Sequence, residues 1–218
     1  MQPRLSNQRT AALTRTEVLV IIFTMAVAVV LLIPALAASK RKSSRLNCVS
    51  NIKQIGIAFR LWEGDNNDKY PLAVSVTNGG AMELVVTGNV AACFRVMSNE
   101  LSTPRILLCP EDTHRTYATN FSTGFSGANI SYFVNPDAAE AYPQMILDGD
   151  DNLLVNGKSA QPGILSIGTN GSVGWTKERH HGVGYIGMAD GSAQQVTING
   201  LQQTLQQTGI ATNRLVLP

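Results

Sequence analysis

The sequence has little of what most catalytic and nucleic-acid-binding proteins need. Charged residues make up 15% of the chain, and its net charge of +2 is too close to neutral to favour nucleic acid as a partner. It has no G-x-S-x-G nucleophile motif, no glycine-rich phosphate-binding loop and no spaced carboxylate pair with a positioning histidine. We therefore expect no catalytic residues and a role in structure or binding.

A long run of apolar residues lies near the N-terminus. Residues 18–38 carry no charge, and about 20 such residues suffice for a helix to cross a hydrocarbon layer of about 30 Å. Thirteen of them are Val, Leu, Ile or Phe, which together favour insertion by roughly 4–8 kcal/mol. Glu17, at the edge of the run, opposes this by less than the roughly 2.5–3.5 kcal/mol of a charge at mid-membrane. The run therefore predicts a membrane-inserted helix.

Three interpretations of this run compete. The first is an ordinary membrane anchor. The second is a removable secretory signal, since basic residues precede the run and Ala35-Leu36-Ala37 fits an A-x-A cleavage site. The third is a helix that follows a short leader ending at Ala12.

The third interpretation has a match in a known family. The N-terminus resembles those of type IV prepilins and type II secretion pseudopilins, which have a short basic leader and a hydrophobic first mature residue. In that family Thr is often second, Glu is fifth and Pro is twenty-second. Counted from Leu13, the corresponding residues here are Thr14, Glu17 and Pro34. This chain departs from the family in having Ala12 where Gly is usual and Arg15 at a usually apolar place.

The resemblance implies a processing step and a set of partners. Prepilin peptidase would cut between Ala12 and Leu13 and methylate the new N-terminus, leaving the leader in the cytoplasm. Glu17 of one subunit would neutralise the Leu13 amine of a neighbour, so that two costly charges satisfy each other in low dielectric. The alternative for Glu17 is an acid that lies at the membrane rim. The other implied partners are further pilin or pseudopilin subunits and an inner-membrane assembly platform.

The helix is expected to continue past the membrane segment. Pro34 would kink it rather than end it. Apolar residues then recur at helical spacing, at Leu46, Val49, Ile52, Ile55, Phe59 and Trp62. The sequence thus predicts a leader at 1–12, a transmembrane helix at 13–38, an amphipathic continuation at 39–64 and a globular domain at 65–218.

The rest of the chain predicts short elements. We expect helices at 81–86 and 91–101, a short buried strand at 104–110 between two prolines, and a long loop at 113–129. Strands are expected at 130–134, 144–147, 163–169, 172–176, 182–189 and 192–197, followed by a polar helix at 201–207. Asn170-Gly171 and Asp190-Gly191 each predict a hairpin turn. The result is an α+β fold in which the long helix covers a small antiparallel sheet, the pilin-like fold that the resemblance implies.

A second set of motifs is similar to those of a narrower group. Cys48–Phe59, CVSNIKQIGIAF, followed by Asp65–Pro71, resembles the segment after the anchor in pseudopilin-like proteins of Planctomycetes- and Verrucomicrobia-type bacteria. The other mark of that group is His, nine residues, then Asp-Gly, and here His180 precedes Asp190-Gly191 at this spacing. We interpret the motif as structural, with positive φ angles at a type I′ turn and a histidine bonded across the strands. Metal ligation or acid–base chemistry by His180, His181 and Asp190 is the alternative.

Two further groups of residues have open interpretations. Asp148, Asp150 and Asn152 resemble the start of a calcium loop, but Leu153 and Ser159 replace the Gly and Glu that an EF-hand needs. A solvated acidic turn is the preferred interpretation. A looser calcium cage is the alternative, because some major pseudopilins bind calcium in a comparable loop.

The three cysteines, at positions 48, 93 and 109, show no metal-binding spacing. Outside the cytoplasm two of them could pair. A disulfide between Cys48 and Cys109 is preferred because it would tie the helix to the domain, and three buried thiols are the alternative.

Together these patterns predict a structural subunit, a pseudopilin or minor pilin. It would cross the bacterial inner membrane once, with its C-terminal domain in the periplasm or on an extracytoplasmic filament, and would need no cofactor. The alternative is a secreted or anchored module that binds polysaccharide or calcium, with a signal peptide cut near Ala37.

Overall fold

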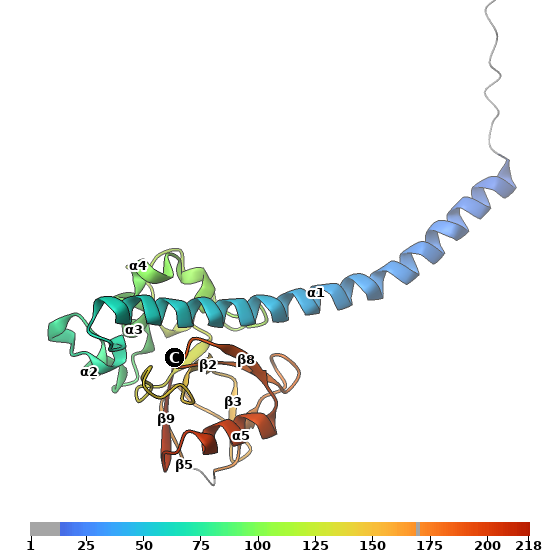
Figure 1. The fold of residues 1–218 in the computed structure, drawn as a ribbon. Coiled ribbons are helices and arrows are strands. Elements are labelled where there is room, and N and C mark those ends of the chain that lie inside the picture. Colours follow the sequence, from blue (N-terminus) through green and yellow to red (C-terminus); the bar gives the residue numbers. More distant parts are fainter. Residues whose placement is uncertain (1–13, 169–170) are drawn as a thin grey trace, which may run out of the picture. The chain divides into compact units, whose positions relative to one another are not determined.

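The computed structural model describes residues 14–168 and 171–218, and its longest element is the helix α1 (Arg15–Asp65; Figure 1). Pro34 lies inside α1 and does not end it. At its start, the Thr14 hydroxyl accepts the Glu17 N–H at 3.3 Å, and the Glu17 carboxylate accepts the Thr14 N–H at 2.7 Å. This reciprocal pair is a capping box, which satisfies donors that the first turn of a helix leaves free.

The chain divides into two compact units, Met1–Ser43 and Ser44–Pro218. In the first unit, Arg15–Pro34 forms 20 residues of helix with a mean hydropathy of 2.7. None of this apolar segment is buried inside the protein. This segment is long and apolar enough to cross a membrane. Residues 44–65 of α1 belong to the second unit, so the amphipathic half of the helix is part of the globular domain rather than a separate segment.

One face of α1 enters the core of the second unit. Its buried apolar side chains are Cys48, Ile52, Ile55, Ala58, Phe59 and Trp62. Apart from the adjacent Ala58 and Phe59, successive members lie three or four positions apart, as the apolar stripe in the sequence predicted. Leu46 departs from that prediction, because 61% of its surface is exposed.

The described chain contains two antiparallel sheets. The main sheet has six strands in the order β5-β9-β1-β2-β7-β8. Their bounds are β1 (Tyr132–Val134), β2 (Ile146–Asp150), β5 (Gly163–Gly168), β7 (Gly184–Met188), β8 (Ala193–Val196) and β9 (Thr212–Leu217). The smaller sheet has the order β4-β3-β6, with β3 (Leu153–Val155), β4 (Lys158–Ser159) and β6 (Val173–Trp175).

The central strands of the main sheet are buried on both faces. In β1, Tyr132 and Val134 join the cluster that contains the buried face of α1. Phe133, between them, joins the cluster of the smaller sheet and α5 (Ile198–Gln207). Successive side chains of a strand point to opposite faces, so a strand covered on both sides is apolar throughout. The fold class is α+β, as predicted.

Short helices connect α1 to the sheets. They are η1 (Pro71–Ala73), η2 (Val76–Asn78), α2 (Met82–Val85), α3 (Val90–Val96), α4 (Ser98–Leu101), η3 (Pro104–Leu107) and η4 (Gly127–Asn129). The strand predicted at 104–110 was wrong, because residues 104–107 form the 3₁₀ helix η3. Pro104 supplies a preset φ at the first helical position, and the Thr103 hydroxyl accepts the Arg105 N–H. These local signals outweigh the apolar run.

The hairpin at Asp190-Gly191 is confirmed, with a different turn. β7 and β8 pair from Gly184↔Val196 to Gly187↔Ala193. Gly191 has a φ of +81°, whereas Asp190 is not among the described residues with positive φ, so the turn is not type I′. The Gly191 N–H donates to the Met188 carbonyl at 2.9 Å, and the Met188 N–H donates to the Ser192 carbonyl at 2.8 Å. This is the pattern of a three-residue loop that ends in a glycine bulge.

The hairpin predicted at Asn170-Gly171 was wrong. Asn170 lies outside the described residues, but the strands on either side of it belong to different sheets. β5 pairs along its whole length with β9, a strand that the sequence analysis did not predict, and β6 pairs with β3. A turn signal marks a change of direction, but the longer pairing with β9 decides where β5 lies.

The β7–β8 turn packs directly on α1. A Cβ added to Gly56 would lie 3.4 Å from the Gly191 Cα, so the two backbones are in close contact. The Arg60 side chain of α1 donates to the Asp190 carbonyl at 2.7 Å and forms an ion pair with Glu140. Asp190-Gly191 therefore holds the hairpin against the helix.

We predict that Gly191→Ala destabilises the domain by about 1–2 kcal/mol, the approximate cost of a left-handed backbone for a residue with a side chain. Gly64→Ala is the control, because Gly64 is helical and has open space around it. That change should leave stability equal or raise it by up to about 1 kcal/mol. Urea unfolding of the detergent-solubilised chain, followed by fluorescence of the buried Trp62 and Trp175, measures both. Equal stability of Gly191→Ala and wild type would contradict the prediction.

Candidate functional site

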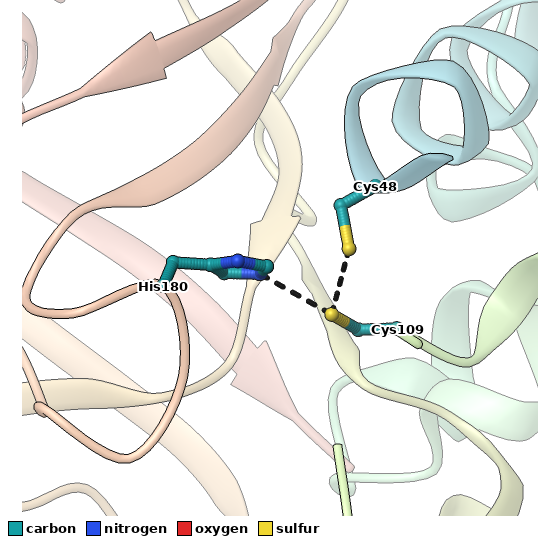
Figure 2. A group of neighbouring side chains, drawn as sticks. All are labelled: Cys48, Cys109 and His180. Carbon is teal, nitrogen blue, oxygen red and sulfur yellow. Dashed lines mark hydrogen bonds between the residues drawn. The ribbon is translucent and has the colours of Figure 1, made fainter. Parts of the chain in front are cut away.

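Three buried side chains from separate parts of the chain meet beside α1 (Figure 2). Cys48 comes from α1, Cys109 follows η3 and His180 lies in the loop before β7. The Cys48 and Cys109 sulfurs are 2.7 Å apart, and the Cys109 sulfur is 3.2 Å from His180 Nε2. The three ligand atoms all lie within 4.8 Å of one another. Both cysteines are free.

His180 is held in place by its backbone and its ring. Its φ of +54° is left-handed, and its N–H donates to Glu111 Oε2 at 2.9 Å. The imidazole packs edge-on against Tyr185, with ring centroids 4.8 Å apart. These contacts direct Nε2 towards Cys109.

Two carboxylates flank the imidazole. Glu111 Oε2 lies 3.1 Å from Nδ1, although the angle is outside that of a hydrogen bond. Asp150, at the end of β2, has Oδ2 3.6 Å from Nε2. That oxygen also accepts the Tyr185 N–H at 2.8 Å, whereas Asp150 Oδ1 is buried without a hydrogen-bond partner. The imidazole therefore has a carboxylate near each of its nitrogens.

These groups shift the pKa values of one another. The close contact of the two sulfurs lowers the pKa of Cys109 and raises the pKa of Cys48. Burial lowers the pKa of His180, but the hydrogen bond with Cys109 and the charge of Asp150 outweigh it and leave the pKa raised. Burial, with the charge of Cys109, raises the pKa of Asp150 to about 7. The arrangement favours a thiolate at Cys109 beside a protonated imidazole.

This thiolate is out of reach of an ordinary substrate. Cys48 and Cys109 are both 0% exposed, and His180 is 1% exposed. A nucleophile needs access to the atom that it attacks. The group can instead hold a metal ion or form a disulfide, because neither needs an entering substrate.

A network of ion pairs lies beside this group. Asp112 accepts from Arg115 at 2.9 Å, from Arg179 at 3.3 Å and from the Ser131 hydroxyl at 2.7 Å, and both arginines also pair with Asp151. Burial acts to raise the pKa of Asp112, but the Ser131 hydrogen bond and the Arg179 charge leave it lowered. A polar cavity of about 360 Å³ adjoins the network. Its lining includes Glu111, Asp112, His114, Arg115, Glu178 and Arg179.

The proposed calcium residues lie elsewhere than the sequence suggested. Asp148 and Asp150 are part of strand β2 and 0% exposed, so the expectation of a solvated acidic turn was wrong. The strand is covered on both faces, which removes its acids from water. In the described chain, the group of converging His, Cys, Asp or Glu ligands includes neither of them, and the Asn152 amide donates to Thr176.

The structure separates the two ends of the His-x9-Asp-Gly motif. Asp190 lies in the β7–β8 turn, where its carboxylate accepts the Ser192 N–H at 2.8 Å, while His180 lies against Cys109. His181 is exposed. An acid–base pair or a shared metal site of these three residues is therefore not formed, and the ring of His180 does not bond to the opposing strand as predicted. The Cys109–His180 contact was missed because the two residues are 71 positions apart.

Of the residues predicted to act at the N-terminus, the structure describes only some. Ala12 and Leu13 lie outside the described residues, while Glu17 closes the capping box of α1. Comparison with family models, with curated proteins and with solved structures finds no match to this chain.

Buried Asp148 generates a prediction about pH. Burial, with the charge of Asp150, raises its pKa well above the ordinary value, which is about 3.9 in the unfolded chain. Between these two values the folded chain keeps a proton that the unfolded chain loses, so stability falls as pH rises. We expect Asp148→Asn, which does not titrate, to gain stability relative to wild type between about pH 5 and about pH 8.

Asp112→Asn is the matched comparison. The folded pKa of Asp112 is lowered, so its contribution is present above the unfolded pKa and is lost only as pH falls below that range. Asp112→Asn should be destabilised by a similar amount at about pH 5 and at about pH 8. Urea midpoints measured at each pH decide the matter, and a difference between Asp148→Asn and wild type that does not change with pH would refute the burial argument.

Proposed function

We propose that the protein is a structural subunit, a pseudopilin or minor pilin, of a type II secretion or type IV pilus-like filament. The observation that carries this proposal is the composition of α1. Its first half is apolar and unburied, and its second half supplies one face of the core of an α+β domain. A pilin-like subunit needs both parts in one helix, because the first half inserts in the inner membrane and later packs inside a filament.

The N-terminal register supports the same proposal. Thr14, Glu17 and Pro34 fall at the second, fifth and twenty-second positions when counted from Leu13. In the described chain the Glu17 carboxylate is hydrogen-bonded to Thr14, beside the position where cleavage would create a new amine. Those bonds come from uncharged donors, so the charge of Glu17 remains available for the amine of a neighbouring subunit.

The outer face of α1 offers a surface for such a neighbour. In the second unit, Leu46, Ile57 and Leu61 are 61%, 46% and 56% exposed. In the first unit the apolar side chains are exposed along the whole segment, with Ala26 and Ala28 allowing helices to approach closely. A second copy of the chain would cover these side chains and remove them from lipid and water.

The proposal includes a location and a set of partners. The protein would cross the bacterial inner membrane once, with the domain in the periplasm or on an extracytoplasmic filament. Prepilin peptidase would remove residues 1–12, and an inner-membrane platform would assemble the subunits. Growth of the filament, rather than a catalytic site, would do the work.

Substitutions at Glu17 separate charge pairing from helix capping. Glu17→Leu removes both the charge and the capping box, whereas Glu17→Gln keeps a side-chain oxygen for the capping box and removes only the charge. If the carboxylate neutralises a neighbour's amine, both variants should reach normal membrane levels and lose filament incorporation. The loss of one partner of a buried pair costs about 3–5 kcal/mol per subunit. Crosslinked oligomer, compared with total membrane protein, measures this, and normal assembly of Glu17→Gln would refute charge pairing.

Processing gives an independent test. N-terminal sequencing and intact mass of the membrane-extracted protein should show a chain that begins at Leu13 with a methylated amine. A chain that begins near Ala38 would instead be released from the membrane and would rule out a filament subunit.

A second candidate function is an extracytoplasmic binding module. The polar cavity of about 360 Å³ beside the Arg115–Arg179 network favours it, because charged and hydroxyl side chains there could recognise a polysaccharide or another polar ligand. Such a module would have its signal cut near Ala37. The mature N-terminus therefore decides between the two candidates.

A further inference from the structure

We propose that Cys48, Cys109 and His180 together bind a divalent transition-metal ion of the zinc class. Two sulfurs and one imidazole nitrogen converge within 4.8 Å, and all three residues are buried. Thiolate and imidazole are the ligands that zinc prefers, whereas calcium and magnesium require oxygen. This inference does not depend on filament assembly and would hold equally for a binding module.

The position of Glu111 beside His180 resembles the surroundings of a metal-bound histidine. Such a histidine keeps one nitrogen for the ion and turns the other towards a carboxylate or carbonyl, which fixes the tautomer. Here Nε2 faces Cys109 at 3.2 Å, and Nδ1 lies 3.1 Å from Glu111. Glu111 also accepts the His180 N–H, so the same carboxylate fixes the backbone of the ligand and lies beside its Nδ1.

The buried carboxylate of Asp150 lies beside the imidazole but outside the three converging ligands. Its Oδ2 lies 3.6 Å from Nε2, and its Oδ1 has no hydrogen-bond partner although the residue is 0% exposed. A buried carboxylate oxygen without a partner is costly. A cation among the two sulfurs and the imidazole would stabilise that charge.

A disulfide satisfies fewer of these atoms. A Cys48–Cys109 bond would use both sulfurs but would leave Nε2 facing uncharged sulfur and Asp150 Oδ1 still without a partner. A metal ion engages both sulfurs and the imidazole nitrogen at once, and its charge acts on the neighbouring Asp150 carboxylate. With Zn–S bonds of about 2.3 Å at a tetrahedral angle, the sulfurs would move from 2.7 Å to about 3.8 Å apart.

The ion would fasten α1 to the rest of the domain. Cys48 lies on the helix, Cys109 after η3 and His180 in the loop before β7, so one ion joins three segments. Because the ligands meet only in the folded chain, the free energy of metal binding becomes free energy of folding. We expect chelation to lower the unfolding temperature of the domain.

The first experiment uses the full chain, solubilised in detergent and kept reduced. Mass spectrometry of the metals should find about one zinc per chain, and removal of zinc followed by Co²⁺ should give thiolate-to-cobalt charge transfer and tetrahedral d–d bands. Peptide mapping without reductant reports whether Cys48 and Cys109 are instead joined. A joined pair in protein isolated from its own membrane, or a reduced chain that takes up neither Zn²⁺ nor Co²⁺, would overturn the proposal.

Variants assign the ligands. Cys109→Ala and His180→Gln should each lose the bound ion, while Cys93→Ala is the control, because Cys93 is a buried cysteine of α3 outside the group. Glu111→Gln should keep the ion but weaken binding about 10–100-fold, since it changes a positioning residue and not a ligand. Unchanged binding in both ligand variants would refute the assignment. Should those variants fail to fold, the cobalt spectrum of the wild-type chain alone decides.

Discussion

The burial of one face of α1 against the central strands is the contact on which the rest of the domain depends. Ile52 of the helix packs near Gly187 of β7, where a Cβ would lie 3.0 Å from it, and the β7–β8 turn meets the helix at Gly56. Phe59 stacks edge-on with Tyr70 and Phe94, which brings the connecting helices onto the same core. Without α1, one face of the main sheet and the connecting helices would lose their apolar partner.

Elements with strong local signals could be predicted from the sequence. The uncharged run and the apolar stripe predicted α1 nearly to both of its ends, and Asp190-Gly191 predicted the β7–β8 hairpin. The capping box was also readable, since Thr14 and Glu17 have the T-x-x-E spacing, but it was overlooked. At 104–110 the local pattern led to a wrong prediction. The apolar run suggested a strand, whereas Pro104 begins a 3₁₀ helix.

Features that depend on distant pairing could not be predicted. β5 pairs with β9 rather than with β6, and no residue near Asn170-Gly171 indicates in the sequence that β9 exists. The candidate site has the same limit. Cys48 and Cys109 are 61 positions apart, and His180 is a further 71 positions along the chain, so no spacing rule detects the group. Only the packing of the helix, the loop after η3 and the loop before β7 brings the three residues together.

The position of β9 has a consequence for the order in which the domain can form. β9 lies between β5 and β1, and every other strand of the main sheet precedes it in the chain. During synthesis, β1 can pair with β2, but its other edge and the whole of β5 stay open until residues 212–217 emerge. Open strand edges invite pairing with other chains. A cell that makes this protein therefore has to keep nascent copies apart, or delay their collapse, until that strand is in place.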